Sequence, residues 1–220
     1  MKEKFYVLLG DVISSRRISD RERFQNEFEE VLEKINTVYV EDIFANFKIL
    51  KGIDEIGGVL STMSNVYKII NEILEQLHPN RIRFVLIFDY IDIGLETFDI
   101  SKMDGPVFHK ASDTLSTLKK SKLMFEMSIS DKMIDTAITG QINLILLTKK
   151  NWSLKQHQIV REYKRTNNQD DVAKKLGITQ QAVSKTLNKI MWKEIYLIEK
   201  KLNYIIDDYS QKLHAKGDIK

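Results

Sequence analysis

Apolar residues along the first two thirds of the chain alternate between short unbroken runs and longer stripes with helical spacing. Residues 5–9 and 81–88 are short apolar runs typical of buried strands, and residues 47–60 predict a hairpin with glycines near its tip. Apolar side chains recur every three or four positions over residues 24–39 and 66–77, which predicts two helices. The predicted order is βαββαβ with additions, an α+β domain with a ferredoxin-like sheet and its helices largely on one face.

The following segment carries the signals of three short helices. Ser153 and Gln156 have capping-box spacing, and the apolar residues after them predict a helix over residues 153–164. Asp170 and Asp171 favour the start of the next helix, and Gly177 can take the left-handed conformation that ends it. Thr179 can cap the start of the helix after that. These signals predict a short helix, a tight turn and a second helix.

A helix-turn-helix needs a small residue where its helices cross, a glycine in the turn and apolar residues on the shared face. Ala173 and Gly177 meet the first two requirements. The shared face is supplied by Val172, Leu176, Ile178, Val183 and Leu187. We interpret the segment as a DNA-binding helix-turn-helix, and a three-helix module that docks on another protein is the alternative.

The charge distribution favours DNA as the partner. Residues 152–193 contain nine Lys and Arg against three Asp and Glu, whereas the whole chain has a net charge of only +3. On the second helix, the residues outside the core are of types that hydrogen-bond base edges or phosphates in the major groove. The expected DNA-binding residues are Gln180, Gln181, Ser184, Lys185, Asn188 and Lys189.

Residues 194–220 have balanced charge and a different apolar period. Their apolar residues recur at intervals of three and four, as in the a/d seam of a coiled coil. The seam consists of Ile195, Ile198, Leu202, Ile205 and Tyr209. It either pairs two chains or packs back on its own domain, and the pattern leaves both open. Because a single helix-turn-helix reads few base pairs, we expect a homodimer.

Composition excludes several classes of protein. The absence of cysteine rules out disulfide bonds, thiolate metal sites and a cysteine nucleophile. The longest apolar runs fall far short of the roughly 20 residues that cross a bilayer, and the first residues lack the apolar core of a signal peptide. We therefore expect a cytoplasmic protein with no membrane partner.

Two carboxylates are placed at predicted strand ends. Asp11 follows the first apolar run, which Gly10 is expected to end, and Asp54 lies at the tip of the predicted hairpin. In a βαββ arrangement these two points lie side by side. Paired carboxylates there can hold Mg²⁺ or Mn²⁺ ions that clamp a nucleoside triphosphate, so Asp11 and Asp54 are the candidate metal ligands.

Several short motifs resemble those of the SatD family of bacterial proteins. They are residues 10–16, Asp20-Arg21, Asp54-Glu55 with Gly58-Val59-Leu60, Arg83-Phe84, and Asp104-Gly105-Pro106 with His109 and Ala111. The resemblance covers essentially the whole chain. It implies an N-terminal domain distantly similar to class III nucleotidyl cyclases and GGDEF-type palms, followed by a helix-turn-helix similar to that of sigma factors.

The same resemblance places Arg16, Arg21 and His109 near a nucleotide cleft, which makes them the candidate nucleotide-binding residues. Where the family hairpin usually has a glycine, this chain has Ile53, and a side chain there keeps the backbone away from a phosphate. We therefore expect a domain that senses a nucleotide or serves assembly without turnover. A metal-dependent nucleotidyl cyclase or transferase using the two carboxylates is the alternative.

We expect three parts along the chain: a cyclase-like domain over residues 1–149, a helix-turn-helix domain over residues 150–193, and a C-terminal helix for dimerisation over residues 194–220. The expected function is that of a transcription regulator. Its partners would be double-stranded DNA, a second copy of the chain and a nucleotide, with Mg²⁺ or Mn²⁺ as the expected cofactor of the nucleotide.

Overall fold

The computed structural model describes residues 3–215 and has the mixed α+β architecture that the hydrophobic pattern predicts. The last five residues of the predicted C-terminal part lie outside the described residues. In chain order the strands and helices are β1 (Glu3–Val12), α1 (Arg21–Val38), β2 (Ile43–Lys51), β3 (Glu55–Leu60), α2 (Val66–Gln76), β4 (Ile82–Ile91), α3 (Pro106–Leu118), β5 (Phe125–Ser128), α4 (Lys132–Lys149), α5 (Leu154–Thr166), α6 (Gln169–Leu176), α7 (Gln180–Lys189) and α8 (Trp192–Ala215).

The five strands form one sheet in the order β2-β3-β1-β4-β5. Neighbouring strands are antiparallel except β5, which runs parallel to β4. The expected end of the first strand at Gly10 is wrong, because β1 continues to Val12, which pairs with Ile82. Gly10 lies inside the strand, where a Cβ atom would come within 2.9 Å of the Ile56 and Phe84 side chains. This glycine therefore permits close packing between strands instead of ending one.

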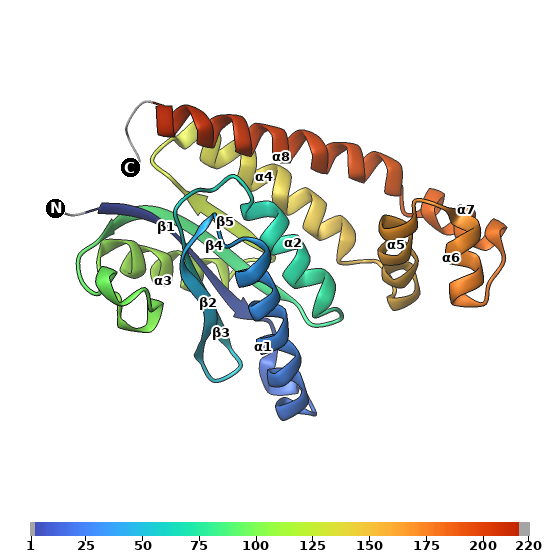
Figure 1. Ribbon diagram of the computed structural model, residues 1–220, viewed down its shortest axis with the longest axis horizontal. Coiled ribbons are helices and arrows are strands. Elements are labelled where there is room, and N and C mark those ends of the chain that lie inside the picture. Colours follow the sequence, from blue (N-terminus) through green and yellow to red (C-terminus); the bar gives the residue numbers. More distant parts are fainter. Residues whose placement is uncertain (1–2, 216–220) are drawn as a thin grey trace.

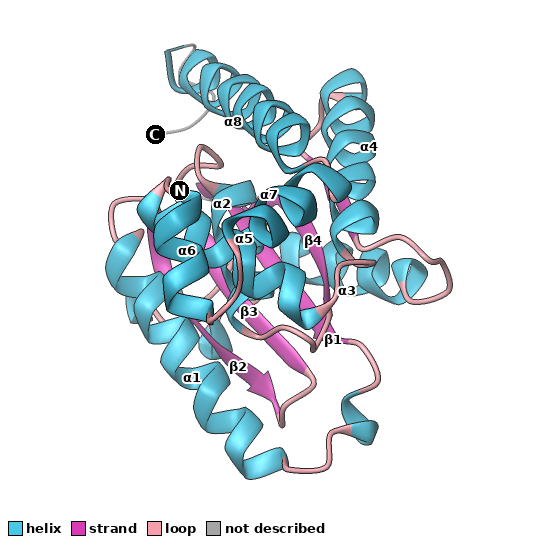
Figure 2. Ribbon diagram, turned by 90° about the vertical axis from the view of Figure 1, so that its right-hand side faces the viewer, coloured by secondary structure: helices cyan, strands magenta, loops and turns pink. Residues whose placement is uncertain are grey.

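Helices cover both faces of the sheet (Figures 1 and 2). On β1, Tyr6 and Leu8 belong to the core that α1, α2 and α4 complete, whereas Val7 and Leu9 pack in a second core under α3. The helices α1, α2 and α4 share one face, which agrees with the expectation that the helices lie largely on one face, and α3 covers the other. A central strand that is buried on both sides is an unbroken apolar run, and the run at residues 5–9 is of this kind, so it indicates that both faces of the sheet are covered.

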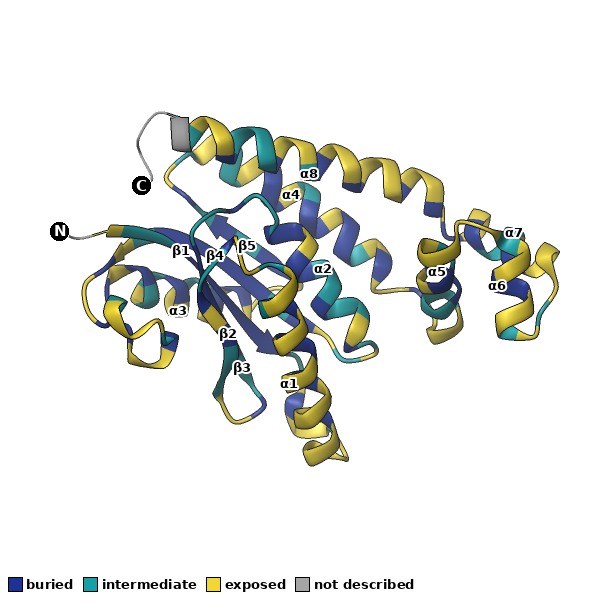
Figure 3. Cartoon of the chain, in the orientation of Figure 1, coloured by how far each residue is buried: buried dark blue, intermediate teal, exposed yellow. Residues whose placement is uncertain are grey.

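The helices α5, α6 and α7 lie at one end of the molecule, and the long helix α8 runs back from them over α4 (Figure 1). Each of α5, α6 and α7 has a buried side, shown dark blue in Figure 3, and these buried residues share one cluster with those of the sheet. Trp152, Ile159, Val172 and Val183 belong to the same apolar cluster as Tyr6 and Leu8. The helical end is therefore packed onto the rest of the chain and is not tethered by a flexible linker.

The predicted a/d seam of α8 is divided between the core and solvent. Ile195 and Leu202 are buried against the chain's own helices, while Ile198 and Ile205 are 43% and 41% exposed. The buried face follows a different set of positions, with Ile206 and Ser210 in place of the exposed isoleucines. The sequence left open whether the seam pairs two chains or packs on the chain's own domain. Packing on the chain's own domain explains the buried half of the seam.

Buried polar groups join α8 to the sheet domain. Glu199 accepts hydrogen bonds from Lys149 Nζ and Tyr67 Oη, each over 2.5 Å, and the Lys149 ammonium also donates to Asn71 over 2.6 Å. Glu199 and Lys149 are only 6% and 5% exposed. Burial, followed by the Glu199 charge, raises the pKa of Tyr67 well above its ordinary value, so this phenol remains a donor. We call Tyr67, Lys149 and Glu199 the junction cluster.

Two histidines meet at the same junction. His78, which follows α2, stacks on His157 of α5 with ring centroids 3.7 Å apart. Burial and then the facing His78 lower the pKa of His157 to about 4. Burial and then the Arg81 charge also lower the pKa of His78. Both imidazoles are therefore neutral near pH 7.

The free energy of unfolding should fall as the pH drops from about 6.5 to about 4, because the unfolded His157 binds a proton in this window and the folded one does not. Above this window both states are neutral and the group contributes no pH dependence. Since the ring is partly exposed, we expect a loss of about 1–2 kcal/mol. Urea unfolding across this range measures the loss. The variant His157→Phe should flatten it, whereas His109→Gln, at an exposed site, should retain it. Equal profiles for wild type and His157→Phe would contradict this account.

Among the described residues, no helix is long and apolar enough to span a membrane.

Candidate functional site

The ends of α5, α6 and α7 are fixed by the residues that the sequence singles out. Ser153 and Gln156 form the predicted capping box at the start of α5. Gly177 ends α6 with a positive φ of 62°, a conformation that glycine adopts without strain, and Thr179 Oγ1 accepts the Ala182 amide over 3.1 Å. The N-cap of α6 is Asn168, whose side chain accepts two amides of the first turn. The predicted roles of Ser153, Gln156, Gly177 and Thr179 are confirmed, whereas the Asn168 cap was not predicted.

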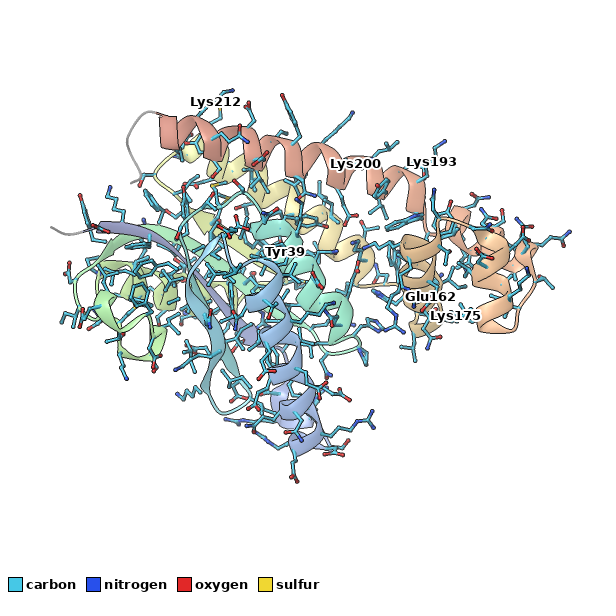
Figure 4. All side chains as sticks on the ribbon, viewed as in Figure 1. Tyr39, Glu162, Lys175, Lys193, Lys200 and Lys212 are labelled. Carbon is cyan, nitrogen blue, oxygen red and sulfur yellow. The ribbon has the colours of Figure 1, made fainter. Side chains whose placement is uncertain are left out.

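An ion pair fixes α6 against α5. The buried Glu162 carboxylate of α5 binds Lys175 of α6 over 2.7 Å and Arg165 over 3.2 Å, as the labelled pair in Figure 4 illustrates. Val172 and Val183 complete the shared apolar core between the helices. The packed core and the glycine turn therefore set the angle between α6 and α7, and the ion pair fixes α6 against α5.

One face of α7 is buried and the other is polar. Val183 and Leu187 are buried. Five of the six predicted DNA-binding residues are exposed, and Ser184 is half-buried; the exposed ones are Gln180, Gln181, Lys185, Asn188 and Lys189. Gln180 also donates to Gln169 of α6 over 2.6 Å. In Figures 1 and 2, α7 lies at the end of the molecule away from the sheet, so the sheet domain does not cover this polar face.

The carboxylate of Asp11 forms ion pairs with two basic side chains. Its Oδ1 lies 2.7 Å from Lys119 Nζ, and its Oδ2 accepts a hydrogen bond from Arg83 Nη1 over 3.1 Å. Arg83 comes from the neighbouring strand β4, and Lys119 from the end of α3. Asp11 is 9% exposed, so the two cations neutralise a carboxylate that has lost most of its water.

The backbone of Asp54 lies next to that of Asp11. The amide of Val12, the residue after Asp11, donates to the Asp54 carbonyl oxygen over 2.8 Å. Its Oδ1 is buried and has no hydrogen-bond partner among the described residues. The neighbouring Ile53 is 3% exposed and packs into the core under α1 and α2. The hairpin tip, where the family pattern has a glycine, is therefore used here for packing.

The acidic pair stays a predicted metal site, and in the structure Asp11 is held by two ion pairs. In the part of the chain that the structure describes, no group of three or more His, Asp or Glu side chains is placed to hold a metal ion. Asp11 would have to exchange Lys119 and Arg83 for a metal ion. The arrangement that the structure shows is an ion-paired carboxylate beside a second carboxylate with one unpartnered oxygen.

The three candidate nucleotide-binding residues do not come together. Arg16 lies in a short 3-10 helix just after β1, and Arg21 begins α1, so both follow the C-terminal end of β1. His109 lies near the start of α3, beside the end of β4 that pairs with the first residues of β1. Its Nε2 is 3.5 Å from Asp104, and the side chain is 74% exposed. His109 therefore lies at the opposite end of the sheet from the two arginines.

Replacing Asp11 with asparagine should lower the free energy of unfolding by about 1–3 kcal/mol, because Arg83 and Lys119 would lose their shared carboxylate. The control is Asp113→Asn, which alters an exposed carboxylate of α3 and should change stability little. Chemical unfolding of the two variants measures the difference. A stability equal to or above that of the wild type would instead indicate two carboxylates that repel each other and await a metal.

A five-stranded sheet with helices on both faces, joined to a packed helical end, defines the chain as a mixed α+β protein. It belongs to the SatD family, whose model matches residues 5–206. No curated protein matches the chain. Two solved structures of bacterial light-regulated adenylyl cyclases are similar, at 10% and 12% identity and TM-scores of 0.44 and 0.42, and each match covers 58% of this chain and 44% of the other. The chain thus spans less than half the length of those structures.

Proposed function

We propose that the protein is a DNA-binding regulator that reads duplex DNA with α7. The observation that carries the proposal is the two-sided character of this helix, whose apolar face is buried while Gln181, Lys185 and Asn188 remain exposed. Helices α6 and α7 act as a helix-turn-helix, with α7 as the helix that enters the major groove. Glutamine and asparagine pair with adenine, and lysine reaches guanine or phosphate.

The experiment is retardation of fragmented genomic DNA by the full chain at low salt. We expect retardation that weakens steeply between about 50 and about 200 mM salt, because phosphate contacts release counterions. A folded full-length protein that retards no fragment at low salt would overturn the proposal. The full chain is used because α8 and α5 share a core with the sheet domain.

In this proposal the ferredoxin-like sheet domain senses a ligand or supports assembly and does not catalyse nucleotidyl transfer. The ion-paired Asp11 and the packed Ile53 support a domain without turnover. Incubation with each nucleoside triphosphate and Mg²⁺ or Mn²⁺ should release no more pyrophosphate than the same protein carrying Asp11→Asn. Release that depends on Asp11 would favour the metal-dependent cyclase or transferase instead.

We expect the DNA-bound form to be a homodimer, since two helix-turn-helix units about one helical turn apart give useful specificity. The exposed half of the α8 seam, Ile198 and Ile205, and the exposed Tyr204 beside it are available for this contact. Light scattering of the protein at tens of micromolar should give about twice the 25.7 kDa mass of the chain. A mass of one chain, alone and with DNA, would contradict a dimer.

A further inference from the structure

A cavity of about 280 Å³ lies at the junction of α2, α4 and α5. It is separate from the polar face of α7 and from Asp11, and its lining comes from both the sheet domain and the helical end. Junctions of this kind are where small-molecule sites in proteins commonly occur, and such sites begin at about this size.

The walls of the cavity are apolar and aromatic. Leu74, Met124 and Leu146 line it together with Trp152. The Trp152 ring lies 5.4 Å from the His157 ring, which stacks on His78. A flat apolar ring finds both aliphatic contacts and aromatic edges in these surroundings.

The cavity also contains a polar atom that needs a partner. His78 lines the cavity, and its Nδ1 is buried without a hydrogen-bond partner among the described residues. A buried polar atom left unpaired is costly, so a shift of the His78 ring that brings this nitrogen to a donor is favourable.

The charge of the lining favours an anion. Glu75 is the only carboxylate among the described lining residues, and it is already held by Lys164 over 2.5 Å and by Lys149 over 3.5 Å. Although burial favours the neutral form of Glu75, these lysines lower its pKa. Arg81 and Lys150 also line the cavity, and neither forms an ion pair with any described carboxylate. Two cations therefore remain to bind a negative group.

We propose that this cavity binds a small aromatic carboxylate. The ring lies among Leu74, Leu146 and Trp152, and the carboxylate binds Arg81 and Lys150. An acid with a hydroxyl beside its carboxylate, such as 2-hydroxybenzoate, also has a donor that His78 Nδ1 can accept after a small rotation of the ring. The site is independent of the proposed DNA binding, because it uses no residue of α7.

The test is titration of the full-length protein with benzoate, 2-hydroxybenzoate and nicotinate, followed by calorimetry and by tryptophan fluorescence. The chain has two tryptophans, and Trp192→Phe leaves Trp152, in the cavity wall, as the only emitter. We expect saturable binding of at least one of the three acids and a matching change in Trp152 emission. Benzyl alcohol, which has the ring without the charge, should bind at least about tenfold more weakly.

Variants connect the binding to the site. Arg81→Gln and Lys150→Gln change exposed side chains, so both variants should fold. Each should lower the affinity for the carboxylic acid about tenfold. Lys132→Gln, at the far end of α4, is the matched control and should bind like wild type. The proposal is overturned if none of the three acids binds below about 10 mM, a generous limit for so small a ligand. It is equally overturned if benzyl alcohol binds as well as the acids, or if both cation variants bind normally.

Discussion

Replacing Glu199 with glutamine is expected to lower the free energy of unfolding by about 1.5–3 kcal/mol, because the buried Lys149 ammonium loses the nearer of its two carboxylates. Lys149 is 5% exposed, and without the Glu199 charge its nearest carboxylate is Glu75, 3.5 Å away. Tyr67 would at the same time lose its charged acceptor. The control is Glu194→Gln in the first turn of α8, where the side chain is exposed and stability should change little.

The double variant Lys149→Met with Glu199→Gln isolates the interaction energy between these two side chains from their other contacts. Removing both charges should cost clearly less than the sum of the two single changes, because neither partner is then left alone. Urea unfolding of the single and double variants gives the coupling energy. Additive losses would mean that Lys149 and Glu199 do not interact, and the junction cluster would then not hold α8 to the sheet domain.

The second large effect is expected on DNA affinity. Lys185→Glu should weaken binding by about 1–3 kcal/mol through the loss of a base or phosphate contact, with added repulsion at low salt. Gln181→Ala should reduce discrimination between sequences more than it reduces the affinity for random DNA. Lys132→Glu makes the same charge change on α4 and should bind almost normally. Fluorescence anisotropy with a selected duplex measures all three variants.

Two outcomes would contradict the role of α7. Lys185→Glu and Lys132→Glu could weaken binding equally, which would indicate an attraction set by net charge alone. Alternatively, Gln181→Ala could leave sequence preference intact, which would move base recognition to another element. In both cases the stability of the variants serves as the folding control, because Gln181 and Lys185 are exposed.

Local rules predicted the helical end well. Caps, capping boxes and a left-handed glycine depend on neighbours within four residues, so Ser153, Gly177 and Thr179 can be assigned without knowing the rest of the fold. The first two helices of the sheet domain also follow from their apolar stripes. Whether the exposed side of α7 binds DNA stays a prediction, since exposure shows what is available and not what binds there.

The sequence was less informative where residues far apart in the chain meet. The apolar spacing of α8 suggested a seam through Ile198 and Ile205, yet the buried face instead carries Glu199. A glutamate at a core position is stable only because Lys149 and Tyr67 reach it from α4 and α2. One signal was present: a charged residue occurs within the apolar stripe of α4 and another within that of α8. The pairing of the two could not be read from spacing.

The acidic pair illustrates the same limit. Strand order placed Asp11 beside the hairpin of Asp54, and their backbones do meet. The cations that bind Asp11, however, come from β4 and from the end of α3. The unbroken apolar run of β1 indicates two covered faces but does not say which helix covers the second one, so the path of α3 was not predicted. The neutralised carboxylate is therefore a product of tertiary structure.

The central claim, that α7 reads DNA sequence, is tested most directly by comparing two duplexes of equal length and composition. One is selected from a random library by the full-length protein, and the other is its shuffled sequence. At about 150 mM salt, the account predicts that the selected duplex binds at least about 10³-fold more tightly. Lys185→Glu should remove most of that difference. Equal affinities for the two duplexes, or binding to neither, would contradict the claim.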